Sequence, residues 1–200
     1  MGYGGHSLSQ ALATELELVQ RVCDYIETTI DRAPTLVEIG AHFHVSHFHL
    51  QRMFKRVLGI SPRQYAEGYR LESFKTLVRG GHSVTTALYD AGYGSSSRLY
   101  ERAPEMLGMT PLTYSKGGTG MEIAYLICTC KLGRLLVGTT DRGVCAVHLR
   151  QNDDDLRDML RREYPLAEIR ETDEMCEWVQ EILAHIDGSH PHLDLPVDIR

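Results

Sequence analysis

The side chains best suited to chemistry lie between residues 47 and 63, and their chemistry is nucleic-acid recognition. Glutamine can bond adenine and arginine can bond guanine through paired hydrogen bonds in the major groove, and an aromatic ring can pack against a thymine methyl group. The candidates for base contacts are His47, Phe48, Gln51 and Arg52. Basic side chains beside them would bind phosphate and position the protein without reading sequence. These phosphate candidates are Lys55, Arg56 and Arg63.

The distribution of charge along the chain favours the same interpretation. The 200 residues carry a net charge of −6, which taken alone argues against a nucleic-acid partner. Residues 46–79, however, contain seven Lys and Arg and only two Glu, a local charge of +5. Residues 1–116 sum to +1 and residues 117–200 to −7. This asymmetry predicts two units with different partners.

The segments that must position the candidates are predicted to be helical. Apolar residues recur at helical spacing over 9–30, which indicates an amphipathic helix. Thr35 and Glu38 have the spacing of a capping box at the start of a second helix. Gly40 in that helix is small enough to let another helix approach closely.

A third helix is expected to carry the base-contacting candidates on its exposed face. Ser46 would cap its N-terminus, and Gly59 would end it after Leu58. Its buried stripe is predicted to be Leu50, Phe54 and Val57. A fourth, long helix is expected over 62–79, with Pro62 in the tolerated first turn.

An internal repeat organises the first half. The segment LGISPRQY (58–65) matches LGMTPLTY (107–114) at an offset of 49, and further upstream the offset becomes 48. Two copies of short helix, tight turn and helix, joined by a long helix, describe a tandem helix-turn-helix. If the linker holds the copies about one turn of DNA apart, each second helix enters a successive major groove.

The second copy presents a weaker set of base-contacting candidates, which are Ser96, Ser97, Arg98 and Glu101. Glu101 stands where Arg52 stands in the first copy, so it can accept from cytosine but cannot read guanine. Pro104 takes the position of Lys55 and would kink or end the helix. The second copy is therefore expected to bind DNA more weakly than the first.

A group of histidines offers a competing, metal-binding interpretation of the same region. The four are His42, His44, His47 and His49. Zinc requires three or four converging ligands, and no cysteine or carboxylate lies beside these histidines in the sequence. Phosphate contact or partial burial is the preferred explanation, and no metal or other cofactor is expected.

The second half changes its hydrophobic period after a glycine-rich joint at 117–120. Three short apolar segments separated by glycine-containing turns predict an antiparallel meander. The expected strands cover 122–130, 134–140 and 144–149. Asn152 would cap a helix to about Tyr164, and Thr172 would cap a final helix through Ile186.

The cysteines favour a reducing compartment. There are five, an odd number, and none forms a CxxC pair. We therefore expect reduced thiols in the cytoplasm, with Cys128, Cys130 and Cys145 as packing residues. The chain has no apolar run of 18 residues and its N-terminus lacks a secretory pattern, so no membrane partner is expected.

The first half resembles the AraC-type DNA-binding domain. The resemblance rests on SHFHLQRMFK (46–55) with LGISP (58–62), and on AGYGS (91–95) with LGMTP (107–111), and it covers about residues 18–116. It implies that the aligned candidates contact bases in double-stranded DNA. It also implies a transcriptional regulator, with RNA polymerase as the partner of an activator.

The second half is similar to the N-terminal subdomain of O6-alkylguanine-DNA alkyltransferases, through LGRLLV (132–137), TDRGVCAV (140–147) and LPVDIR (195–200). The resemblance implies a small ribonuclease-H-like antiparallel sheet with two helices. In that family a cysteine in a Pro-Cys-His-Arg motif accepts the alkyl group. This motif does not occur here, nor does the zinc domain found in related regulators, and the catalytic subdomain would begin just after Arg200.

The expected architecture is therefore multidomain, α followed by α+β. A tandem helix-turn-helix over 1–116 is joined through 117–120 to an alkyltransferase-like subdomain over 121–200. Two functions remain open. The first is a sequence-specific regulator linked to alkylation damage, whose acidic half is an inert remnant or a partner surface. The second is a fragment of a bifunctional regulator and methyltransferase; either way, no alkyl transfer is expected from the chain as given.

Overall fold

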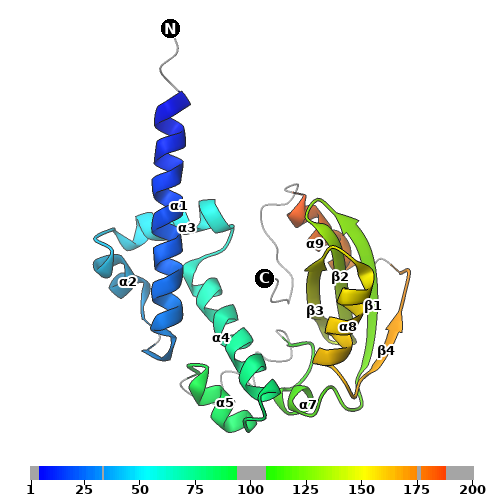
Figure 1. Ribbon diagram of the computed structural model, residues 1–200. Helices are drawn as coiled ribbons and strands as arrows, with labels where there is room; N and C mark the ends of the chain where they lie inside the picture. Colours follow the sequence, from blue (N-terminus) through cyan, green and yellow to red (C-terminus); the bar gives the residue numbers. More distant parts are fainter. Residues whose placement is uncertain (1–4, 33, 94–106, 175–176, 188–200) are drawn as a thin grey trace. The chain divides into compact units, whose positions relative to one another are not determined.

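The computed structural model describes residues 5–32, 34–93, 107–174 and 177–187 (Figure 1). The chain folds into two compact units, and the division between them falls inside a long helix. One unit is Met1–Lys75 with Tyr89–Gly92, and the other is Thr76–Leu88 with Tyr93–Arg200. This division lies elsewhere in the sequence than the joint at 117–120, and the predicted domain boundaries stay a prediction.

The first unit is helical, as its sequence predicts. Its elements are α1 (Gly5–Thr28), a 3₁₀ turn η1 (Ile30–Arg32), α2 (Leu36–His42), α3 (His47–Leu58) and the larger part of α4 (Pro62–Arg79). The helix predicted over 9–30 begins four residues earlier in the structure and ends at Thr28, where the 3₁₀ turn follows closely. The bounds predicted for α4 are confirmed.

The capping signals of this unit are confirmed in detail. The Thr35 N–H donates to Glu38 Oε2 at 2.7 Å, and the Glu38 N–H donates to Thr35 Oγ1 at 3.3 Å, which completes the capping box. Ser46 Oγ accepts from the His49 N–H at 3.2 Å at the start of α3. Gly59 ends α3 with a φ of 75°, and its N–H donates to the Lys55 carbonyl.

The core of the first unit lies between α1, α2 and α3. Its fully buried members are Val19, Val22, Ile26, Ile39, Leu50, Met53 and Phe54. The predicted stripe on α3 is correct for Leu50 and Phe54, whereas Val57 is only half-buried. Met53 is buried as well, because it lies three residues after Leu50 and so shares the same helix face.

The second unit contains a four-stranded sheet. After α5 (Val84–Asp90) and α7 (Pro111–Ser115) come β1 (Glu122–Cys130), β2 (Gly133–Thr140), β3 (Gly143–Arg150), α8 (Asp153–Glu163), β4 (Glu168–Glu171) and α9 (Glu177–Ile186). The strand order is β3-β2-β1-β4. The antiparallel meander of β1 to β3 is confirmed, but β4 pairs with β1 in parallel, so the sheet is mixed.

Two helices pack on the sheet. On one face, Val179 and Ile182 of α9 share a core with Leu135, Val137 and Val144. The other face carries α8, whose Leu156 and Leu160 are fully buried. Asn152 caps α8 as expected. The prediction that Thr172 caps the last helix is wrong, because its N–H donates to the Tyr125 carbonyl at 2.9 Å and continues the strand pairing; α9 begins at Glu177.

Candidate DNA-binding site

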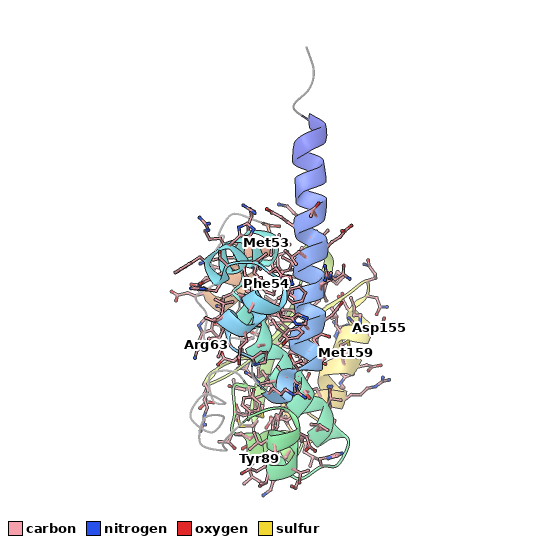
Figure 2. All side chains as sticks on the ribbon, turned by 90° about the vertical axis from the view of Figure 1, so that its left-hand side faces the viewer. Met53, Phe54, Arg63, Tyr89, Asp155 and Met159 are labelled. Atoms are coloured by element: carbon pink, nitrogen blue, oxygen red, sulfur yellow. The ribbon has the colours of Figure 1, made fainter. Side chains whose placement is uncertain are left out.

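The recognition surface is the exposed face of α3. Met53 and Phe54 point into the core shared with α1 (Figure 2), and this fixes the rotation of the helix. The opposite face carries four exposed side chains, Phe48, Gln51, Arg52 and Lys55. The structure therefore places the candidates Phe48, Gln51 and Arg52 on one continuous face with Lys55, whereas the candidate His47 is half-buried.

Phe48 is the most prominent apolar side chain on this face, with an exposed fraction of 67%. The half-buried ring of His47 lies against it, with ring centroids 4.0 Å apart and planes tilted by 36°. This contact restricts the orientation of the phenyl ring at the start of the helix. A ring held in this way can pack against a thymine methyl group without first losing its freedom of rotation.

The phosphate candidates differ in their surroundings. Arg56 forms an ion pair with Glu15 of α1, a partner that the sequence patterns did not reveal. Lys55 and Arg63 are exposed and have no ion pair within the described part of the chain. Lys55 and Arg63 are therefore free to bind phosphate, whereas Arg56 must exchange one carboxylate for another anion.

The turn between α2 and α3 sets the angle at which α3 is presented. The Val45 N–H donates to the Gly40 carbonyl at 2.9 Å. A Cβ atom on Gly40 would lie 2.7 Å from the Val45 carbonyl oxygen, so the expected close approach is made by the turn itself. His44 occupies the left-handed region with a φ of 56°.

The backbone of the second copy repeats this turn. The Tyr93 N–H donates to the Leu88 carbonyl at 3.0 Å, and Gly92, with a φ of 82°, stands where His44 stands in the first copy. Downstream, Gly59 and Gly108 have φ values of 75° and 63° at the offset of 49. The repeat inferred from sequence is thus present in backbone conformation.

The base-contacting candidates of the second copy lie outside the described residues. They are Ser96, Ser97, Arg98 and Glu101. Pro104, the predicted helix breaker, lies outside them too. All of these stay predictions.

Two of the four histidines, His42 and His47, are engaged in ring contacts. His42 stacks on Tyr25 with ring centroids 4.2 Å apart, and His47 contacts Phe48. In the portions of the chain that the structure describes, no group of three or more His, Cys, Asp or Glu side chains has the arrangement of a metal site.

Burial also affects the pKa values of two cysteine thiols. It raises the pKa of the Cys23 thiol and of the Cys128 thiol above their ordinary values, which disfavours the nucleophilic thiolate. Cys128 and Cys130 pack against the core under α9. This agrees with their interpretation as packing residues.

Comparison with known proteins finds relatives that match both halves of the sequence. Residues 39–117 match the model of a helix-turn-helix domain family. The chain is 33% identical over 186 residues to the bifunctional transcriptional activator/DNA repair enzyme Ada of Escherichia coli strain K12, with 92% of this chain and 52% of that protein covered. The chain therefore contains a helix-turn-helix domain and is similar to this Ada protein over most of its own length.

Two other relatives are similar to this chain over different lengths. It is 30% identical over 193 residues to the regulatory protein ada of Salmonella typhimurium strain LT2, covering 96% of this chain and 54% of that protein. It is 26% identical over 99 residues to the melibiose operon regulatory protein of Escherichia coli K12, covering 49% and 33%. The chain thus spans about half the length of the two Ada relatives.

These matches show a helix-turn-helix domain in this chain and a similarity to two Ada proteins that extends beyond that domain. Within the described ranges of this chain, no helix is both long and apolar enough to cross a membrane.

The patterns in the sequence did not reveal two further contacts of the chain. Tyr65 donates from its hydroxyl to Glu27 of α1, and Tyr114 donates to Glu163 of α8 at 3.3 Å. The two tyrosines are equivalent in the repeat, since they are 49 residues apart. That equivalence was the signal that could have indicated a shared anchoring role.

Proposed function

We propose that this chain is a sequence-specific transcriptional regulator that acts in the response to DNA alkylation damage. The observation that carries the proposal is the exposed face of α3, where an aromatic ring, an amide and a guanidinium lie within one helical turn. These three groups suit different base edges in the major groove. The Ada relatives, a transcriptional activator and DNA repair enzyme and a regulatory protein, supply the link to gene activation and DNA repair.

Each candidate residue has a role in this proposal. His47, Phe48, Gln51 and Arg52 would contact bases from the first copy, and Ser96, Ser97, Arg98 and Glu101 from the second. Lys55, Arg56 and Arg63 would hold phosphates and set the register. The basic segment 46–79 would attract DNA despite the negative charge of the whole chain.

The partners follow from this function. We propose double-stranded DNA as the ligand and RNA polymerase as the protein partner of an activator, with no cofactor and a cytoplasmic location. The alternative, a fragment of a bifunctional regulator and methyltransferase, gains no support from the thiols of Cys23 and Cys128, since their pKa values are raised.

Selection of bound DNA from a random pool tests the proposal directly. The expected result is one enriched motif with two half-sites about 10 base pairs apart, since two helices would enter successive major grooves. Binding without any enriched sequence would show that the chain contacts only the backbone. Absence of binding at low salt would sink the proposal altogether.

A further inference from the structure

The end of the second helix-turn-helix copy is buried, whereas the corresponding part of the first copy is open. Leu107 has no exposed surface, but its repeat equivalent Leu58 is 39% exposed. A Cβ atom on Gly59 would meet nothing within 4 Å. On Gly108 it would lie 2.8 Å from the Cys145 Cβ atom and 3.1 Å from Thr140 Oγ1. The two glycines share a left-handed conformation, so the difference lies in what surrounds them.

Gly108 is held by the sheet of the second half. Thr140, at the end of β2, donates from its hydroxyl to the Gly108 carbonyl at 2.8 Å, and the Thr140 hydroxyl is itself buried. Cys145 on β3 packs against Gly108 from another side. Because a buried carbonyl must find a donor, this hydrogen bond fixes where the chain leaves the second copy.

Tyr114 of α7 makes a second attachment, on α8. Its ring meets that of Tyr164 edge to face, with centroids 5.8 Å apart, and its hydroxyl donates to Glu163. The other carboxylate oxygen of Glu163 lies 3.3 Å from His148 Nε2 on β3, and the Tyr164 hydroxyl donates to the Cys145 carbonyl at 2.7 Å. Helix α7 and the end of α8 therefore share a buried polar network.

The glycine-rich joint is part of the attachment. The Leu166 N–H donates to the Gly117 carbonyl at 2.9 Å. Cβ atoms on Gly117 and Gly118 would lie 2.9 Å from Pro165 Cγ and 3.0 Å from Ala167 Cβ. A free tether would have open space at these positions, as Gly120 does. The glycines instead allow the chain to lie tightly against the segment after α8.

The repeat explains why such a platform is needed. In the first copy, Tyr65 donates to Glu27 of α1, a helix that precedes the motif. In the second copy, the equivalent Tyr114 donates to a glutamate of α8, a helix that follows it. Helix α8 thus takes the place that α1 has for the first copy.

We propose that Thr140, Tyr114 and Glu163 are positioning residues for DNA binding by the second copy, and that the alkyltransferase-like half is the platform on which this copy is mounted. The proposal rests on the proposed DNA-binding function. It gives the acidic half a role in recognition that needs no alkyl transfer.

The test is a footprint of the full-length chain on its selected DNA, resolved by half-site. Arg52→Ala first marks the half-site of the first copy. Tyr114→Phe and Gly108→Ala should then abolish protection at the other half-site only, with about ten- to a hundredfold weaker binding overall. Gly59→Ala is the matched control, since it introduces the same backbone strain without the contact.

The outcomes separate this proposal from the proposed function. Lack of any wild-type footprint would overturn the function itself. Two protected half-sites that survive both Tyr114→Phe and Gly108→Ala would overturn the platform alone, as would a wild-type footprint confined to one half-site. Thermal unfolding followed by circular dichroism identifies a variant that has lost its fold, and Tyr114→Phe, which removes one oxygen, keeps the test decisive if Gly108→Ala does not fold.

Discussion

Phe48 is an aromatic side chain that the core does not use. Leu50 and Phe54 face inward from α3 and have no exposed surface. Phe48, on the opposite face, is 67% exposed. It lies one helical turn from Gln51 and Arg52. One docking of α3 in a groove therefore brings an apolar group and two hydrogen-bonding groups onto neighbouring base edges.

At the residue scale, Arg52→Ala should relax specificity at one base position. A bidentate arginine–guanine pair contributes about 1–3 kcal/mol of discrimination, and alanine removes it without altering the helix. The measurement compares the preferred sequence with variants at each position, for the wild type and Arg52→Ala. A profile unchanged at every position would show that Arg52 does not read a base.

Lys55→Ala should instead weaken binding to all DNA sequences by a similar factor. It should also reduce the slope of log K against log salt by about 1, because one phosphate contact is lost. Arg56→Ala should reduce the slope by less, since Arg56 is paired with Glu15 and already partly neutralised. Binding isotherms at several salt concentrations distinguish the two. Equal slopes for both variants would contradict the role of the Glu15 pair.

At the scale of elements, ion pairs join neighbouring segments of the second half. Arg134 on β2 donates from Nε and Nη2 to the two carboxylate oxygens of Asp153, at 2.6 and 2.8 Å, in the first turn of α8. Arg157 of α8 similarly reaches Glu171 of β4. The hydrogen bonds from these arginines hold the pKa of Asp153 and of Glu171 below their ordinary values.

These pairs predict a loss of stability in acid. A carboxylate whose folded pKa is lowered stabilises the fold above its unfolded pKa, near 4, and this contribution disappears as pH falls through the folded pKa. Asp153→Asn should therefore destabilise the protein at pH 7 and have little effect near pH 2. Urea unfolding across that range measures the difference. Asp173→Asn, at an exposed carboxylate that lacks a described ion pair, is the control and should change stability little at either pH.

At the scale of the whole molecule, the two halves differ in charge, but the segment where they meet in the sequence belongs structurally to both. Residues 107–114 belong to the repeat by sequence, but Gly108 and Tyr114 pack on the alkyltransferase-like half. Their burial makes this stretch part of both modules. The acidic half is therefore more than a neighbour in sequence.

Limited proteolysis should reflect this. Lys116 is exposed, yet its N–H donates to the Leu112 and Thr113 carbonyls, and the Gly117 carbonyl accepts from Leu166. Trypsin needs an extended, unbonded segment, so we expect no cleavage after Lys116 in the native chain. The same bond should be cut in urea, which serves as the control. Rapid native cleavage there would show that 117–120 is a free linker.

Local patterns predicted much of the fold and of the first site. The capping box at Thr35, the glycine stop at 59 and the strands β1 to β3 depend on neighbouring residues, and the structure confirms them. The short polar strand Glu168–Glu171 escaped prediction, since its pairing with β1 comes from a distant part of the chain. For the same reason Thr172 was assigned to a helix although it continues that pairing.

The sequence by itself determined the repeat, the helical face that carries Phe48, Gln51 and Arg52, and the change from helices to strands, because each is written in spacings of a few residues. Only the tertiary structure decided that Arg56 is paired with Glu15, and that Gly108, Tyr114 and Gly117 pack on the second half. The physical reason is that these contacts join residues about 30 to 50 positions apart. No local periodicity encodes such a distance.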